Sequence, residues 1–168
     1  RIGRDGVTVL TNGNFVVTSS DYYFKRGAVT WVNGSTGLNG AVSSSNSLIG
    51  EWLSGAYPGD SAGSGGVTAL SNGNYVVSSP NWTSQITTIN GAFQTTTTAV
   101  KAGAVTWGNG STGITGVIGT SNSLAGASFG RDLITSDGDG GWLLLSVQPL
   151  RDTTGQVPSP QIAVHVVG

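Results

Sequence analysis

The sequence predicts an all-β fold built from a repeated unit of about 60 residues, and three observations favour it. The first is composition, since 28 of the 168 residues are Gly, only 9% are charged, and Val, Thr and Ser are abundant. Such residues suit short strands joined by tight turns, and they rank low in helix propensity. The second is that no stretch shows the apolar spacing of an amphipathic helix. The third is an internal repeat.

The repeat has two well-matched parts. Residues 6–20 (GVTVLTNGNFVVTSS) match residues 66–80 (GVTALSNGNYVVSSP) at ten of fifteen positions. Residues 27–50 match residues 103–126 at sixteen of twenty-four positions. Because the offset is 60 in the first part and 76 in the second, the second copy contains an insertion, which falls in residues 81–102.

A third, diverged copy opens near Phe129, where FGRDLITSDGDGGWLLLS corresponds to IGRDGVTVLTNGNFVVTS at residues 2–19. No later part of the sequence corresponds to the segment from NGSTG to SNSL. We therefore predict a single repeat array with unit one at residues 1–60, unit two at residues 61–127 and a partial third unit at residues 128–168.

Each unit reads as four short strands. Asn12-Gly13 in unit one and Asn72-Gly73 in unit two lie between two apolar runs. This dipeptide is the strongest short-range hairpin signal, because both residues tolerate positive φ in a type I′ turn. The third strand is GAVTW, whose alternation is typical of a half-buried strand. The fourth strand is predicted at residues 40–45 (GAVSSS) or 116–121 (GVIGTS), with SNSL following it.

One four-stranded sheet cannot bury its apolar face alone, so neighbouring units should stack. We predict a β-propeller-like array of four-stranded antiparallel blades. Trp31 and Trp107 recur at one position of the unit and should fill the gaps between neighbouring sheets. A partial unit leaves a sheet edge to be paired, so other copies of the chain, or the remainder of a larger parent chain, are the expected partners.

The order of motifs resembles the FG-GAP repeat, which forms the blades of integrin α-type β-propellers. The FG itself is at residues 129–130, with residues 2–3 (IG) as its counterpart, and residues 79–80 (SP) stand where the GAP tripeptide ends. The GxVYVY strand of that family corresponds to residues 27–31 and 103–107. The motif order is also similar to repeats of large bacterial surface proteins of the filamentous haemagglutinin kind. The resemblance covers nearly the whole chain and implies an extracellular or cell-surface location in bacteria.

Two features depart from the FG-GAP pattern. Members of that family have about seven blades, and this chain has fewer than three. The first two turns, LTNGN and LSNGN, lack the carboxylates that Ca²⁺ prefers as ligands. Only Asp137 and Asp139 in the third turn are left as candidate calcium ligands, and the alternative is that Asp simply suits a turn. No other cofactor is expected.

The chain is not expected to be an enzyme. It has eight acidic residues and a single histidine, His165, which lies in an apolar strand-like run. No Ser-His-Asp order and no G-x-S-x-G motif occurs. Glu51 and Asp60, which lie on one short segment, are interpreted as part of an exposed loop between units rather than as a glycosidase pair.

Aromatic residues in the variable segments are expected to be exposed and are the candidates for ligand contact. These are Trp52, Tyr57 and Trp82, and Tyr22 and Tyr23 share their character. Aromatic rings with polar neighbours can stack on sugars, so a carbohydrate-binding, lectin-like β-propeller is the alternative function.

We therefore expect a non-catalytic extracellular structural or adhesive repeat module that self-associates or forms part of a larger surface assembly. The net charge of −1 and the scattered basic residues do not suit a nucleic-acid partner. There is no apolar run of membrane-spanning length. The absence of Cys excludes a disulfide scaffold and a thiolate metal site.

Overall fold

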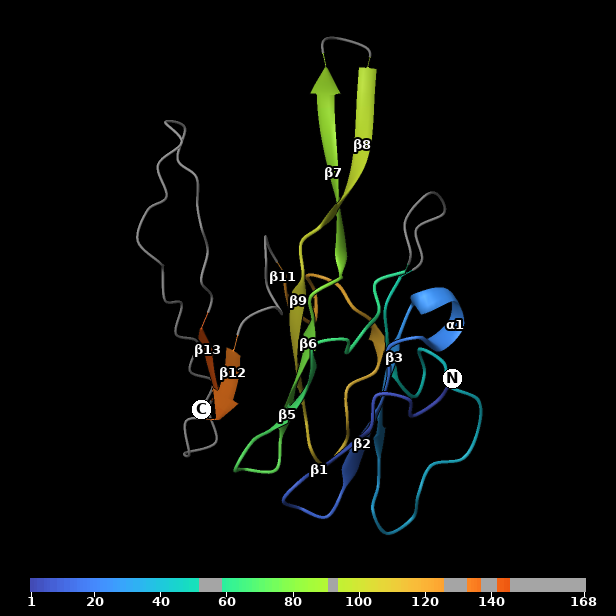
Figure 1. The fold of residues 1–168 in the computed structure, drawn as a ribbon, viewed down its shortest axis with the longest axis vertical. Helices are drawn as coiled ribbons and strands as arrows, with labels where there is room; N and C mark the ends of the chain where they lie inside the picture. The colour runs from blue at the N-terminus through green and yellow to red at the C-terminus, as the bar shows by residue number, and fades with distance from the viewer. Residues whose placement is uncertain (52–58, 91–93, 126–132, 137–141, 146–168) are drawn as a thin grey trace.

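The computed structural model describes residues 1–51, 59–90, 94–125, 133–136 and 142–145, and over these it confirms an all-β chain (Figure 1). The helical segment found in them, α1 (Tyr22–Lys25), has positive φ at Tyr23, Phe24 and Lys25, so it is a left-handed turn rather than a regular helix. No helix in this part of the chain has the length and hydropathy needed to cross a bilayer.

Unit one forms a sheet with the strand order β1-β2-β3-β4-β10. Strands β1 (Val7–Val9), β2 (Phe15–Ser19), β3 (Ala28–Val32) and β4 (Leu48–Ile49) pair antiparallel in chain order. The fifth strand, β10 (Gly116–Val117), comes from unit two. The sheet of unit one is thus completed by its neighbour.

Unit two repeats the same pairing in a sheet with the order β11-β9-β6-β5. Its strands are β5 (Gly66–Ala69), β6 (Tyr75–Ser79), β9 (Ala104–Gly108) and β11 (Leu124–Ala125). Val16 faces Trp31 across β2 and β3, and Val76 faces Trp107 across β6 and β9. Corresponding segments of the two units therefore have the same conformation and register, which confirms the repeat.

The Asn-Gly hairpins form, but the predicted type I′ turn is wrong. Gly13 has φ +85° and Gly73 has φ +86°, whereas the preceding Asn12 and Asn72 do not have positive φ. In unit one the Gly13 N–H donates to the Leu10 carbonyl at 3.1 Å, and the Leu10 N–H donates to the Asn14 carbonyl at 2.8 Å. This is a three-residue hairpin in which a type I turn is followed by a left-handed Gly.

The predicted position of the fourth strand is wrong in both units. In unit two, Gly116–Val117 pairs with β4 of unit one, and the strand that pairs with β9 is Leu124–Ala125. In unit one, residues 40–45 are not in a strand, and the strand that pairs with β3 is Leu48–Ile49. The cause is Asn46, whose Nδ2 donates to the Ala41 carbonyl at 2.9 Å and whose Oδ1 accepts the Ser43 N–H at 2.9 Å. These bonds fold the residues before Asn46 into a loop, so SNSL supplies the start of the strand instead of following it.

The insertion of unit two forms a long two-stranded hairpin from β7 (Thr83–Asn90) and β8 (Gln94–Lys101), which projects beyond the sheets in Figure 1. In the third unit, β12 (Leu133–Ser136) pairs antiparallel with β13 (Trp142–Leu145). This confirms the first hairpin of the predicted third copy.

The core joins the two larger sheets. One cluster of buried side chains takes Leu10, Val16, Val29 and Leu48 from unit one, and Ala62, Tyr75, Val77, Trp82, Ala102, Ala104 and Ile118 from unit two. The first strands of the units follow one another, because β5 lies against β1 and β12 lies against β5. The units are therefore stacked in chain order, and the two larger sheets are open ones.

Candidate functional site

The backbone carbonyl of Gly110 is the point at which unit one holds unit two by hydrogen bonds. It accepts hydrogen bonds from Asn12 Nδ2 at 2.8 Å, from Asn14 Nδ2 at 2.8 Å and from Trp31 Nε1 at 2.9 Å. A carbonyl oxygen has two lone pairs, so three donors share this one acceptor. All three donors belong to unit one, and the acceptor belongs to the turn after the GAVTW strand of unit two.

Asn14 connects a contact inside its own unit to the contact between units. Its Oδ1 accepts the Gly34 N–H at 3.0 Å, while its Nδ2 reaches Gly110. Asn74, the counterpart of Asn14, accepts the Gly110 N–H at 2.9 Å in the same way. Sequence analysis missed Asn14, although the repeated N-G-N triplet carried the signal.

The predicted structural residues of the turns lie at the same interface. The Thr11 Oγ1 donates to the Ser71 carbonyl at 3.4 Å, so the two Asn-Gly turns lie side by side. A Cβ built on Gly73 would lie 3.4 Å from Asn12, whereas one on Gly13 would meet nothing within 4 Å. Gly73 thus faces the preceding unit, and Gly13 faces open space.

The two recurring tryptophans have different surroundings. Trp31 is half-buried and packs against the core shared by the units, and a Cβ on Gly113 would lie 2.8 Å from the Trp31 Cβ. Trp107, at the same position of unit two, is 37% exposed. Trp31 thus packs between the sheets of units one and two, as expected of this position. Trp107 is partly exposed instead.

A short parallel strand pair is the second connection between the units. In β10 and β4, Gly116 faces Leu48 and Val117 faces Ile49. The Gly116 N–H donates to the Ser47 carbonyl at 3.1 Å, and the Ile118 N–H donates to the Ile49 carbonyl at 2.9 Å. Backbone N–H groups of unit two thereby form hydrogen bonds with carbonyls at the outer edge of β4, the last strand of unit one.

Of the predicted contact residues, Trp82 is described, and the expectation that it is exposed is wrong. It is 8% exposed and lies in the core, and its Nε1 donates to the Ile118 carbonyl at 3.1 Å. A buried indole needs a partner for its N–H, and the residue that follows β10 supplies one.

The remaining candidates Trp52, Tyr57, Asp137, Asp139 and His165 lie outside the described residues. Among the residues that the structure does describe, no group of three or more His, Cys, Asp or Glu side chains is arranged to hold a metal ion.

Asp60 is not in an exposed loop, contrary to the sequence interpretation. It is 1% exposed, and its carboxylate accepts the Glu51 N–H at 2.7 Å and the Thr83 N–H at 3.0 Å. Burial raises the pKa of Asp60 above its ordinary value of 3.8, although the hydrogen bonds from Glu51 and Thr83 oppose the rise. Asp60 therefore links the segment after β4 to the start of β7.

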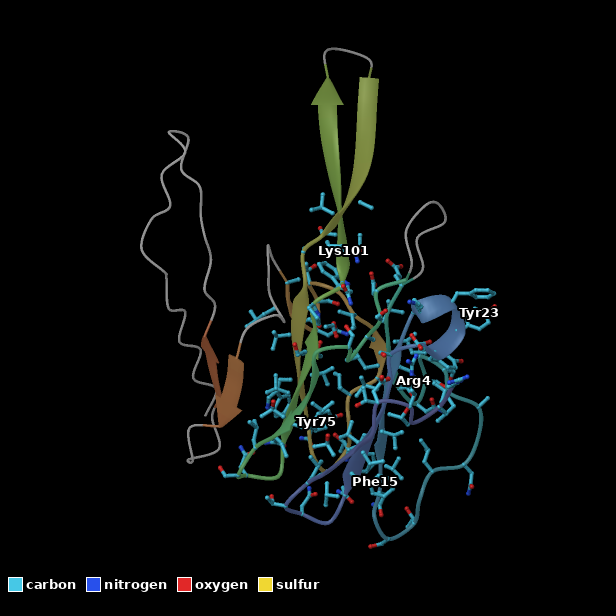
Figure 2. All side chains as sticks on the ribbon, in the orientation of Figure 1. Arg4, Phe15, Tyr23, Tyr75 and Lys101 are labelled. Atoms are coloured by element: carbon cyan, nitrogen blue, oxygen red, sulfur yellow. The ribbon has the colours of Figure 1, made fainter. Side chains whose placement is uncertain are left out.

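Tyr75 is buried against the GAVTW strand of its own unit (Figure 2). Its hydroxyl accepts the Ile114 N–H at 3.2 Å, and a Cβ on Gly108 would collide with its ring. Burial raises the pKa of Tyr75 to about 12. The glycine at position 108, which replaces Val32 of unit one, makes room for this ring.

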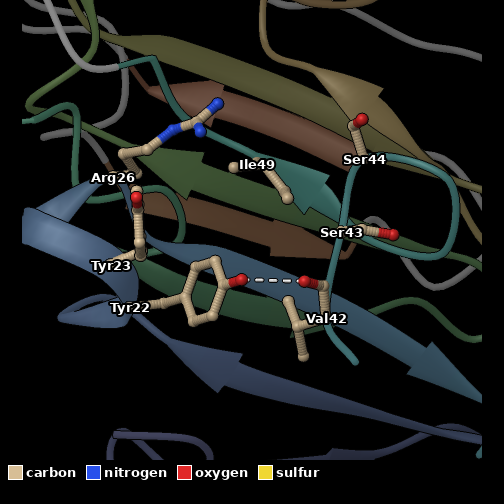
Figure 3. Close-up of a pocket in the computed structure, with 7 residues that line it drawn as sticks. All are labelled: Tyr22, Tyr23, Arg26, Val42, Ser43, Ser44 and Ile49. Carbon is tan, nitrogen blue, oxygen red and sulfur yellow. Dashed lines mark hydrogen bonds between the residues drawn. The ribbon is translucent and has the colours of Figure 1, made fainter. Parts of the chain in front are cut away.

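A pocket of about 350 Å³ lies between α1 and the loop that follows β3 (Figure 3), and it is lined by Tyr22, Tyr23, Arg26, Val42, Ser43, Ser44 and Ile49. The Tyr22 hydroxyl donates to the Val42 carbonyl at 2.7 Å, which holds one wall in place. The Arg26 Nε donates to the Gly50 carbonyl at 2.9 Å. Tyr23, on the rim, is 60% exposed.

The described residues of unit two do not repeat this pocket. Trp82 and Thr83 stand at the positions of Tyr22 and Tyr23, and Trp82 is buried. Sequence analysis named the two tyrosines but missed Arg26, because nothing local indicates that residues 42–44 fold back to it. Chemically, the pocket offers an aromatic face, a guanidinium and hydroxyls.

Comparison with known proteins identifies the repeat. A family model described as a repeat of unknown function (DUF5650) matches residues 9–60 and residues 69–134. No curated protein and no solved structure matches the chain. The first matched segment lies within unit one, and the second covers most of unit two and reaches β12 of the third. The resemblance to FG-GAP repeats remains an expectation.

Proposed function

Since the chain belongs to the DUF5650 family of repeats, we propose that it is a non-catalytic structural module of an extracellular or cell-surface assembly. The observation that carries this proposal is the strand β10, with which unit two completes the sheet of unit one. This strand pairing and the three side chains that donate to the Gly110 carbonyl hold neighbouring units together. A module whose units complete one another is suited to extended surfaces.

The finer arrangement that we propose is radial. Strands β1, β5 and β12 lie against one another in chain order, as the inner strands of successive propeller blades do. This supports a β-propeller-like array of blades, to be completed by other copies or by a larger chain. The low charge and the abundance of Thr, Ser, Asn and Gly support an extracellular location.

A non-catalytic role is supported by how the described carboxylates are used. Of the four described acids, Asp5 accepts the Ser20 N–H, Asp21 pairs with Arg4, and Asp60 accepts two backbone N–H groups. These three carboxylates therefore serve the structure.

Two measurements test the structural role. Antibodies raised against the purified chain should label intact producer cells, and labelling that requires permeabilised cells would refute the surface location. Light scattering after size-exclusion chromatography should show association that grows with concentration. A chain that stays a folded monomer at every concentration would refute self-association and leave a larger parent assembly as the form of the module.

A second candidate function is carbohydrate binding at the pocket of Figure 3. It is favoured by Tyr23 and Arg26, which both line the pocket, since the exposed Tyr23 combines an apolar face with a hydroxyl and Arg has a fork of donors. Because the described residues of unit two do not repeat the pocket, it would not give the repeated sites expected of a lectin-like propeller.

A glycan array tests this candidate. Binding that is lost in Tyr23→Ala and retained in Phe24→Ala would support it, because Phe24 is 70% exposed but does not line the pocket. No binding, or equal loss in both variants, would remove it.

A further inference from the structure

We propose that residues 40–42 of unit one, with the apolar pocket beside them, form the docking edge for a further repeat unit on the N-terminal side of unit one. The fourth strand of that unit would pair with residues 40–42 in parallel. The inference rests on the proposed structural role and adds to it a defined surface, partner and register.

Unit two shows how such an edge is used. Its residues 116–118 correspond to residues 40–42 and form the parallel pair with β4 of the preceding unit. Gly116 and Ile118 donate their N–H groups to the carbonyls of Ser47 and Ile49. Three residues are thus enough to extend the preceding sheet by one strand.

Residues 40–42 already have the same local structure. Gly40 has φ +118° and Gly116 has φ +103°. Asn46 Nδ2 donates to the Ala41 carbonyl, as Asn122 Nδ2 donates to the Val117 carbonyl at 3.0 Å.

The next carbonyl in each segment is held in a matching way. The Tyr22 hydroxyl donates to the Val42 carbonyl, as Trp82 Nε1 donates to the Ile118 carbonyl. Each segment is therefore held from its own side, which leaves the N–H groups of Gly40 and Val42 without hydrogen-bond partners among the described residues. The edge is preorganised for an incoming strand.

Equivalent apolar residues are less buried in unit one than in unit two, at the positions that a preceding unit would cover. Leu38 is 46% exposed and Ile2 is 59% exposed, whereas their counterparts Ile114 and Ala62 pack in the core between the units. Val42 is half-buried, and its counterpart Ile118 is 3% exposed. Unit one therefore presents, uncovered, the apolar positions that unit two buries.

These residues enclose a second pocket, of about 170 Å³, which is lined by Ile2, Val17, Thr30, Val32, Leu38, Gly40, Val42 and Asn46. In unit two, the counterparts Ala62, Val77 and Ile118 belong to the shared core, which also contains Leu48 of the preceding unit. The pocket is thus the place that a leucine at the position of Leu48 would occupy.

The partner must supply hydrogen-bond donors to the Gly34 carbonyl as well as a strand that pairs with residues 40–42. Gly34 corresponds to Gly110, and its carbonyl accepts no hydrogen bond from the described residues. A preceding unit would supply counterparts of Asn12, Asn14 and Trp31 to this carbonyl. The partner is therefore a unit of the same repeat, with an N-G-N turn, a GAVTW strand and an SNSL strand start.

Unit two of a second copy does not fit this role. Strand β12 lies against β5 of unit two, as β5 lies against β1. The face that unit two would present to another copy is thus already in contact with the third unit. We therefore assign the edge to a further complete unit of the same repeat.

A tandem chain tests the inference. Residues 1–60 are duplicated in front of Arg1, which reproduces the junction at which unit two follows unit one. Ile49→Cys in the added copy is combined with Ala41→Cys in the original unit one, because the observed register pairs Ile49 with Val117, the counterpart of Ala41. The natural chain has no Cys, so no other disulfide competes.

Mild oxidation should close this disulfide within the chain, with loss of both free thiols. Ile49→Cys with Val117→Cys in the natural chain is the positive control. Ile49→Cys of the added copy with Ser35→Cys of unit one, an exposed turn position, is the off-register control.

The inference is overturned if the positive control closes and the tandem pair does not, or if the off-register pair closes equally well. Disulfides between separate tandem chains would overturn the assignment to a preceding unit. A tandem chain that fails to fold also counts against it, because a fitting neighbour stabilises a repeat array. If antibodies label intact cells but this disulfide does not form, the docking edge is refuted. The proposed structural role is then still supported.

Discussion

Trp31 of unit one donates its indole N–H to the backbone carbonyl of Gly110 in unit two, 79 residues later in the chain and 2.9 Å away. The equivalent Trp107 is 37% exposed. The same residue in the same strand thus serves as an anchor between units in one copy and as part of the surface in the other. This difference makes the two tryptophans a matched pair for experiments.

Replacing Trp31 by Phe should lower the free energy of unfolding by about 1–2 kcal/mol, since a hydrogen bond contributes about 1 kcal/mol net and some apolar contact is also lost. Trp107→Phe should cost clearly less, because that indole is partly in solvent. Chemical denaturation followed by far-UV circular dichroism gives both values. Equal losses would show that the bond to Gly110 contributes nothing measurable.

Gly110→Ala should be among the more damaging small substitutions, because its Cβ would collide with the backbone carbonyl of Gly73. Backbone cannot move aside as a flexible side chain can, so we expect a loss of about 3 kcal/mol, the upper part of the range for overpacking. Gly119→Ala is the control, because a Cβ there meets nothing within 4 Å. Denaturation midpoints that shift alike in the two variants would contradict this account of Gly110.

Tyr75→Phe removes the acceptor for the Ile114 N–H and should cost about 1–3 kcal/mol, the usual penalty for an unsatisfied buried group. The natural chain should also lose stability as pH rises above about 10. The folded-state pKa of Tyr75 is raised to about 12, so the folded chain keeps a proton that the unfolded chain releases from pH 10 upward.

Measuring the free energy of unfolding from pH 9 to 11 in both proteins isolates this group. The difference between the natural chain and Tyr75→Phe should shrink as pH rises. A difference that stays constant would mean that Tyr75 does not hold its proton more tightly in the folded state.

Asp60 should give stability a pH dependence in the acid range. Because burial raises its pKa, the folded chain binds the proton more tightly than the unfolded chain, so this contribution is fully present below about pH 3.8 and is lost as pH rises through the raised pKa. Asp60→Asn does not titrate. The free energy of unfolding of the natural chain, minus that of the variant, should therefore fall as pH rises above about 3.8. A difference that rises with pH would show that the two backbone hydrogen bonds outweigh burial.

The division of the chain into strands and turns could be predicted, because it depends on local sequence patterns. An apolar residue every second position and an Asn-Gly turn act within a few residues of themselves, so the strands around Asn12 and Asn72 could be located without tertiary information. The turn type was missed because it depends on which backbone groups pair. Leu10 bonds to Asn14 across three loop residues, which makes Gly13 alone left-handed.

The sequence by itself determined the all-β class, the unit length, the insertion and the hairpins, since these follow from propensity and from self-similarity along the chain. Only the tertiary structure decided that Gly116–Val117 pairs with Leu48–Ile49 of another unit, that Trp82 is buried and that Asp60 is a buried link. Each of these depends on a partner that is distant in sequence, and the energy of such a contact is set by where stacking places the partner's backbone carbonyl or N–H group.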